Sequence, residues 1–204
     1  MALFRYYNHP LLRELAFLLP PLYGWRAGTF RAAIEIARRF LPDGTIKAAD
    51  LGTGIGLFAG QLLRHFPNIR VDAVDVNPHM TAIAKRRLLP NRRVRVITSD
   101  VMDLTGPYDA IFALYLLVLV PLEPTLEHLT SILNENGIIV FNLTSPTPAM
   151  KLHRKFYSIF EGSAVNLYPS SEGVRIASCI GEIICIKQVE PIEGSYVIAM
   201  RRRR

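Results

Sequence analysis

Short apolar runs alternate with longer amphipathic stretches through most of this chain. Continuous apolar runs are typical of parallel strands buried on both faces, and an apolar period near 3.6 residues is typical of helices that pack on a sheet. Strands are expected to end at Asp50 and to occupy 69–74, 94–98, 108–115, 138–142, 183–190 and 196–200. Helices are expected at 57–66, 124–134 and 170–181, with another opening at Asn77. This alternation predicts an α/β fold.

The connection after the first strand reads Asp50-Leu51-Gly52-Thr53-Gly54-Ile55-Gly56. Glycine lacks a Cβ, so a ligand can approach the main chain closely there, and the helix that follows offers unpaired N–H groups. A dinucleotide-binding loop has the spacing G-x-G-x-x-G, which would require glycine at position 57 instead of Leu57. The loop therefore indicates a different nucleotide-type cofactor, and a purely structural turn is the alternative.

At these residues the chain resembles the class I S-adenosylmethionine-dependent methyltransferases, whose first motif is an acid followed by G-x-G-x-G at the end of the first strand. The resemblance covers roughly residues 45–142 and 170–200. It implies a Rossmann-like sheet of seven mostly parallel strands flanked by helices, with an antiparallel last strand. It also implies S-adenosylmethionine as cofactor and S-adenosylhomocysteine as product.

Acidic residues follow the second and third expected strands. Asp75 has the spacing of an acid that accepts hydrogen bonds from both ribose hydroxyls, although a solvated loop acid is the alternative. The resemblance implies that Asp100, or alternatively Asp103, accepts a hydrogen bond from the adenine amino group of the cofactor. The cofactor-binding residues that the resemblance implies are Asp50, Gly52, Thr53, Gly54, Gly56, Asp75, Val76, Asp100, Val101, Met102, Ala113 and Tyr115.

The composition agrees with one domain over residues 1–204, since half of the residues are hydrophobic and only 20% are charged. The expected parts are an N-terminal helical lid (1–40), a cofactor-binding core (41–142), a lid insertion (143–169) and a C-terminal helix with a strand pair (170–204). Cys179 and Cys185 lack metal-ligand or redox spacing, so we expect buried thiols and no metal site. The apolar stretch 110–122 is too short to span a membrane, and a cytoplasmic protein is expected.

The net charge of +7 comes from scattered and clustered arginines and lysines, at 85–87, 92–95 and 201–204. For the first two clusters we expect solvent-exposed side chains whose positive charge compensates the negative end of a helix dipole. The terminal cluster could discourage edge pairing, contact acidic lipid headgroups or contact phosphates, and these alternatives stay open.

The acceptor is expected to meet the two parts added to the core, since residues 1–40 and 144–169 are rich in leucine and aromatic residues. Residues 151–160 resemble the same region of ubiquinone/menaquinone C-methyltransferases and lipid N-methyltransferases. A small or lipid-like acceptor, with peripheral contact to an acidic membrane surface, is therefore expected; simple packing of these aromatics on the core is the alternative.

A quinol or phenol acceptor would need a general base, and His153, Tyr157 and His9 are the candidates. An RNA methyltransferase is the second hypothesis, because the net charge is positive but no appended RNA-binding domain is evident. A protein that binds S-adenosylmethionine without turnover is the third. The oligomeric state is left open by the sequence.

Overall fold

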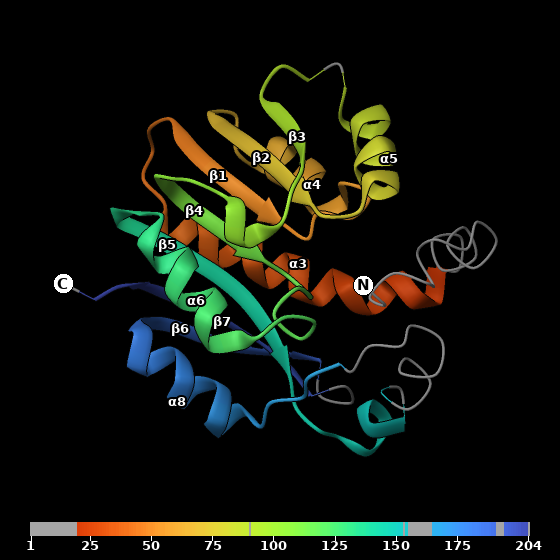
Figure 1. Ribbon diagram of the computed structural model, residues 1–204, viewed down its shortest axis with the longest axis vertical. Helices are drawn as coiled ribbons and strands as arrows, with labels where there is room; N and C mark the ends of the chain where they lie inside the picture. The colour runs from red at the N-terminus through yellow and green to blue at the C-terminus, as the bar shows by residue number, and fades with distance from the viewer. Residues whose placement is uncertain (1–19, 90, 153, 155–164, 191–193, 204) are drawn as a thin grey trace.

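A seven-stranded sheet forms the centre of the computed structural model, which describes residues 20–89, 91–152, 154, 165–190 and 194–203 (Figure 1). The strands are β1 (Ile46–Leu51), β2 (Ile69–Asp75), β3 (Val94–Thr98), β4 (Tyr108–Ala113), β5 (Leu133–Thr144), β6 (Gly181–Glu190) and β7 (Ser195–Arg202). Their order is β3-β2-β1-β4-β5-β7-β6, and only β7 runs antiparallel to its neighbours. The expected mostly parallel, Rossmann-like sheet with an antiparallel last strand is confirmed.

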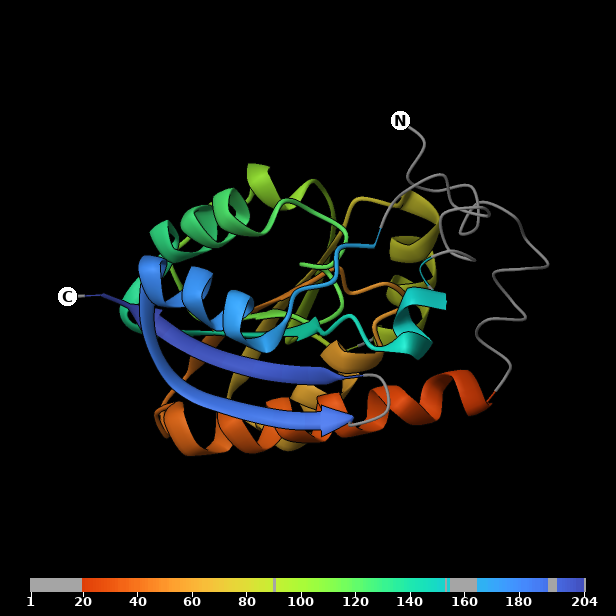
Figure 2. The ribbon, with the colours of Figure 1, turned by 90° about the horizontal axis from the view of Figure 1, so that it is seen from below.

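Helices cover both faces of the sheet (Figure 2). They are α3 (Pro20–Phe40), α4 (Leu57–His65), α5 (Pro78–Leu88), the 3-10 helix η1 (Val101–Asp103), α6 (Leu122–Ser131) and α8 (Ser170–Ile180). One core cluster joins α3, α4 and α5 to one face of the strands, and a second joins α6 and α8 to the other face. Because β1 and β4 are buried between the two layers, their sequences are almost continuously apolar.

The direction of the sheet order reverses between β1 and β4. The chain runs from β1 outward through β2 to β3 and then crosses to β4 on the other side of β1. In open α/β sheets the loops at such a switch point separate and leave a crevice at the carboxyl ends of the strands. The glycine loop after β1 and the residues after β4 therefore face each other across this crevice.

The helix α3 belongs to the expected N-terminal lid (1–40), and part of it packs on the sheet. Ala33, Ile36 and Ala37 are buried against β5, β6 and β7, which anchors the C-terminal half of α3 in the core. The N-terminal half continues toward the carboxyl ends of the strands. Residues 1–19 lie outside the described residues.

The strand β5 begins at Leu133, earlier than the expected start of this strand at residue 138. Leu133 already pairs with Tyr108, and the next pair is Ile138 with Ala110, so the residues between them form a bulge within the strand. The Asn134 side chain donates to Asp109, which holds the bulge against β4. Asparagine and glycine favour turns, so their presence indicated a loop although they belong to the strand.

Several basic residues serve the fold. Arg93 donates to three backbone oxygens at the C-terminal end of α4, namely those of Leu63, Phe66 and Pro67, at 2.9 Å each. Arg95 binds both oxygens of Asp72. The strand β7 lies between β5 and β6, so the terminal arginines do not follow an edge strand. The hypothesis that they discourage pairing at a sheet edge is therefore wrong.

Two smaller expectations are also tested. Cys179 is exposed on α8, contrary to the expected burial, and Cys185 is half-buried on β6. None of the helices in the described part of the chain has the length and hydropathy needed to cross a membrane. Within those same residues, no group of three or more His, Cys, Asp or Glu side chains is placed to hold a metal ion.

Candidate cofactor-binding site

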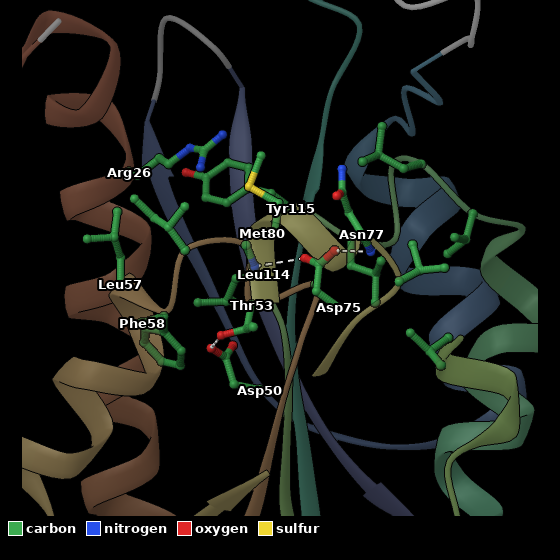
Figure 3. A pocket seen from close by; sticks show the side chains of 18 of the residues that line it. Arg26, Asp50, Thr53, Leu57, Phe58, Asp75, Asn77, Met80, Leu114 and Tyr115 are labelled. Atoms are coloured by element: carbon green, nitrogen blue, oxygen red, sulfur yellow. Dashed lines mark hydrogen bonds between the residues drawn. The ribbon is translucent and has the colours of Figure 1, made fainter. Parts of the chain in front are cut away.

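A pocket opens at the carboxyl ends of β1, β2 and β4 (Figure 3). Nine of the twelve expected cofactor-binding residues line it: Asp50, Gly52, Thr53, Gly54, Asp75, Val76, Asp100, Val101 and Tyr115. The other three, Gly56, Met102 and Ala113, do not line it. Ala113 is fully buried in β4, and the Met102 side chain is 47% exposed outside the pocket.

Two glycines of the loop differ in what surrounds them. Gly54 has φ +55°, and a Cβ placed on it would meet nothing within 4 Å, so its main chain is open to the pocket. Gly56 has φ +79°, and its Cβ would lie 2.8 Å from Leu88 Cδ1 of α5. Both positions favour glycine, but Gly54 leaves room for a ligand whereas Gly56 lets α4 pack against α5.

Asp75 links the two loops that border the pocket. Its Oδ2 accepts a hydrogen bond from the Gly54 N–H at 2.8 Å, and its Oδ1 accepts from the Asn77 N–H at 2.9 Å. Burial raises the pKa of Asp75, and the two backbone hydrogen bonds oppose that shift. Each carboxylate oxygen has a further lone pair, so Asp75 can still accept from a ligand.

Asp100 lines the far end of the pocket. Its Oδ1 accepts from the Met102 N–H at 2.9 Å and thereby caps η1. Val101, beside it, is 7% exposed and supplies an apolar wall. Asp103 does not line the pocket, so Asp100 is the better placed of the two acids that the sequence offered.

Asp50 lies beneath the glycine loop and is only 2% exposed. Its Oδ2 accepts from the Thr53 hydroxyl at 2.6 Å and from the Ala59 N–H at 3.1 Å. Desolvation outweighs these hydrogen bonds and raises the pKa of Asp50 to about 7. Asp50 thus holds the loop to the start of α4, and a cation in the pocket would favour its ionised form.

The raised pKa of Asp50 makes fold stability depend on pH. Between pH 3.8, the ordinary pKa of an aspartate side chain, and about pH 7 the unfolded chain loses this proton and the folded chain keeps it, so the free energy of unfolding falls as pH rises through that window. Asp50→Asn should flatten this fall, measured by urea unfolding at several pH values. The control Asp103→Asn should keep the fall of the free energy of unfolding with pH. If Asp50→Asn and the natural protein show the same dependence on pH, the fall does not come from Asp50.

Tyr115 follows β4 in a conformation that is unusual for a side chain other than glycine. Its φ is +61°, which costs a non-glycine residue about 1–2 kcal/mol. Its N–H donates to Asn142 Oδ1 at 2.6 Å, and its hydroxyl is 2.8 Å from the Thr29 hydroxyl on α3. The Arg26 guanidinium lies 5.0 Å from the centre of the Tyr115 ring.

Two residues of this pocket, both on α3, carry no signal in the sequence. Arg26 and Phe30 of α3 line it, because the long helix brings them to the carboxyl ends of the strands. Asn77 also lines it, and its buried Nδ2 has no hydrogen-bond partner within the described part of the chain. A buried donor of this kind suits an acceptor atom of a ligand. Neither α3 residue belongs to a recognisable local motif, so their roles had no signal in the sequence.

The pocket fits an adenosine-bearing cation. Three carboxylates, on Asp50, Asp75 and Asp100, line it beside the open main chain of Gly54. Apolar side chains such as Leu114 and Val101 complete the wall. Carboxylates suit ribose hydroxyls, an amino group and positive charge, and the apolar wall suits a purine ring.

Comparison with known proteins agrees with this fit. Residues 48–137 match the family model described as Methyltransferase domain, and they include the glycine loop, Asp75 and Asp100. Residues 48–137 therefore form a methyltransferase domain, and the sheet has the Rossmann-like fold of the class I methyltransferases.

Two curated relatives are similar to part of this chain. Malonyl-acyl-carrier-protein O-methyltransferase 1 of Ilyobacter polytropus is 28% identical over 128 residues, which are 55% of this chain and 48% of the relative. The corresponding enzyme of Halalkalibacterium halodurans is 28% identical over 131 residues, 60% of this chain and 48% of the relative. The chain thus spans about half the length of the curated relatives it matches.

Solved structures share the fold at low identity. The magnesium protoporphyrin IX methyltransferase of Synechocystis PCC 6803, with bound S-adenosylhomocysteine, has a TM-score of 0.69 at 16% identity and covers 88% of this chain and 85% of that one. The N-methyltransferase NodS of Bradyrhizobium japonicum WM9 has a TM-score of 0.69 at 12% identity, with 89% and 98% covered. These likenesses establish the methyltransferase fold and do not indicate the acceptor.

The three candidate bases lie outside the described residues. His9 precedes residue 20, and His153 and Tyr157 fall in the segment after β5 that the structure does not describe. Their catalytic role stays a prediction. After β5 the structure describes residues 145–152 and 154, and Lys151 and Leu152 lie exposed in a short helix there.

Proposed function

We propose that this methyltransferase transfers the methyl group of S-adenosylmethionine to a small or lipid-like acceptor by in-line displacement. The observation that carries the proposal is the contact of Asp75 with the Gly54 N–H across the switch point. This hydrogen bond brings the glycine loop and Asp75, the acid proposed to bind the ribose, together in one pocket. The matched family model and the fold neighbours support the same reaction.

The proposed cofactor contacts follow from the position of each residue. Asp75 accepts from the ribose hydroxyls, Asp100 accepts from the adenine amino group, and Val76 and Val101 lie against the purine. Gly52, Thr53 and Gly54 bring the main chain to the ligand, and Asp50 supplies negative charge below the loop. Asn77 joins this set through its buried, unpartnered Nδ2.

When bound, the cofactor supplies a methyl group on a sulfonium cation, which is already activated for displacement. The chain must then place an acceptor atom about 3 to 3.5 Å from that methyl group and exclude water. Tyr115, with Leu116 beside it, lines the pocket after β4 and forms the proposed wall of the acceptor side. Phe30 of α3 also lines the pocket.

The acceptor class is proposed from the parts added to the core. Quinols and phospholipid amines are the proposed types, and the curated relatives named for malonyl-acyl-carrier-protein O-methylation add an oxygen acceptor. RNA stays the second hypothesis; Arg93 and Arg95 give it little support because both are occupied by structural contacts. Binding without turnover is the third, and contact with an acidic membrane surface stays a proposal.

A turnover assay tests this function. The purified protein should release S-adenosylhomocysteine when supplied with acceptors from a panel of quinols, phospholipid amines, small oxygen nucleophiles and RNA. His153→Ala should lower turnover about 100-fold or more if His153 is the base, and leave S-adenosylmethionine affinity unchanged. The control His79→Ala, an exposed histidine on α5, should keep full turnover. Equal turnover in both variants would remove His153 from the mechanism.

A further inference from the structure

The imidazole of His128 joins α6 to η1, two elements that follow different strands of the sheet. Its Nε2 lies 3.1 Å from the Val101 carbonyl oxygen. A carbonyl oxygen only accepts hydrogen bonds, so the His128 Nε2 carries a proton and donates it to this bond. His128 is half-buried and does not line the pocket, whereas Val101 lines it. The histidine therefore contacts the pocket only through a residue of its wall.

The segment η1 is short, and contacts from neighbouring elements must fix its position. It is a single 3-10 turn of three residues after β3, which is an edge strand of the sheet. Such turns have poorer hydrogen-bond geometry than α-helices, and the two backbone hydrogen bonds that close η1 are long, at 3.2 and 3.3 Å. The loop after β2 supports the segment, because the Ser99 N–H donates to the Asp75 carbonyl oxygen at 3.2 Å. His128 adds a support from α6.

The helix α6 is a rigid base for this contact. Its Leu122, Leu126 and Leu129 side chains are buried in the core cluster that also contains Val101. Burial of large apolar side chains fixes a helix on a sheet, and His128 directly precedes Leu129. The place of the imidazole is therefore set by the core of the protein.

The contact matters because η1 carries two residues of the pocket. Asp100 caps the segment through its Oδ1, which accepts from the Met102 N–H at 2.9 Å, and both Asp100 and Val101 line the pocket. A movement of η1 would move this carboxylate and this apolar wall together. Hydrogen bonds weaken steeply when their distance and angle depart from the optimum. The adenine contact proposed for Asp100 is thus sensitive to whatever holds Val101.

We propose that His128 is a positioning residue for recognition of the cofactor base. By holding the Val101 carbonyl oxygen, it keeps the Asp100 carboxylate where it accepts from the adenine amino group. The inference rests on the proposed cofactor contacts and adds the residue that controls their selectivity. Since His128 acts through η1, it governs discrimination between bases more than binding of the ribose.

Calorimetry with two ligands tests this role without a methyl acceptor. The ligands are S-adenosylhomocysteine and its analogue in which hydrogen replaces the adenine amino group. The natural protein should bind S-adenosylhomocysteine about tenfold or more tightly than the analogue, because the amino group donates to a carboxylate. His128→Leu removes the imidazole donor and keeps a side chain of similar bulk, so it should lower this preference about threefold or more. His128→Gln places an amide N–H at a similar distance from the main chain and should keep the preference.

A control variant and a stability measurement separate this role from a general loss of folding. Glu127→Gln changes an exposed side chain of the same helix and should keep the preference of the natural protein. Urea unfolding gives the stability of His128→Leu. A smaller folded fraction lowers the apparent affinities for both ligands by the same factor, so reduced stability alone leaves their ratio unchanged.

The failures of the inference and of the proposed function are distinguishable. If His128→Leu keeps the natural preference, or if His128→Gln loses as much of it as His128→Leu, the hydrogen bond to Val101 does not set base selectivity and the inference is overturned. Equal affinities of the natural protein for the two ligands would remove the adenine assignment of Asp100 and the inference with it. Absence of binding by both ligands would overturn the proposed function itself.

Discussion

Asp75→Ala should weaken S-adenosylmethionine binding by about 100-fold or more, because it removes hydrogen bonds to a charged acceptor that contribute about 1.5–3 kcal/mol each. The loss has two sources. The carboxylate no longer accepts from the ribose hydroxyls, and it no longer holds the Gly54 and Asn77 N–H groups at 2.8 and 2.9 Å. Calorimetric titration of the variant with S-adenosylmethionine measures the effect.

The matched control for this variant is Asp103→Ala. Asp103 is an acid after the next strand, on η1, and it does not line the pocket. Asp103→Ala should therefore bind S-adenosylmethionine with the affinity of the natural protein. Unchanged affinity in Asp75→Ala would remove the ribose assignment and with it the proposed orientation of the cofactor.

Substitutions in the glycine loop should separate binding from folding. Gly54→Val should abolish detectable cofactor binding, because its side chain would enter the open space above the loop. Gly56→Val should instead lower the free energy of unfolding by about 1–3 kcal/mol more than Gly54→Val does, because its Cβ falls 2.8 Å from Leu88 Cδ1. Both positions have positive φ, so the backbone cost of about 1–2 kcal/mol is common to the two variants.

Urea unfolding and cofactor titration of the same two proteins measure these effects. Gly54→Val should unfold at a urea concentration only moderately below that of the natural protein and bind no cofactor. If Gly54→Val binds S-adenosylmethionine with natural affinity, the ligand does not lie against this loop. If Gly56→Val is as stable as Gly54→Val, the contact with α5 is not what requires glycine there.

The parts of the fold that could be predicted from sequence are those with a local pattern. The strand before Asp75 is mostly apolar, and the glycine loop combines an acid with three closely spaced glycines. One helix (α4) and one strand (β2) lead from the glycine loop to Asp75, and their lengths set the spacing between the two motifs. These patterns carried the family resemblance, and the resemblance implied the sheet, its antiparallel last strand and nine pocket residues.

What could not be predicted depends on contacts between distant segments. Thr29 and Tyr115 are hydrogen-bonded although 86 residues separate them, and no spacing rule indicates that α3 reaches the end of β4. The bulge at the start of β5 was also missed, because its asparagines and Gly137 indicate a turn unless the pairing of Leu133 with Tyr108 is known. Gly56 and Met102 matched their motifs but do not line the pocket, because Gly56 lies against Leu88 of α5 and Met102 is exposed.

The most direct test of the account is calorimetric titration of the natural protein with S-adenosylmethionine and S-adenosylhomocysteine, with NAD as control. The pocket with Asp75, Asp100 and the open Gly54 predicts micromolar binding of the first two ligands and none of NAD. Binding of NAD, or no binding of any of the three ligands, would contradict it.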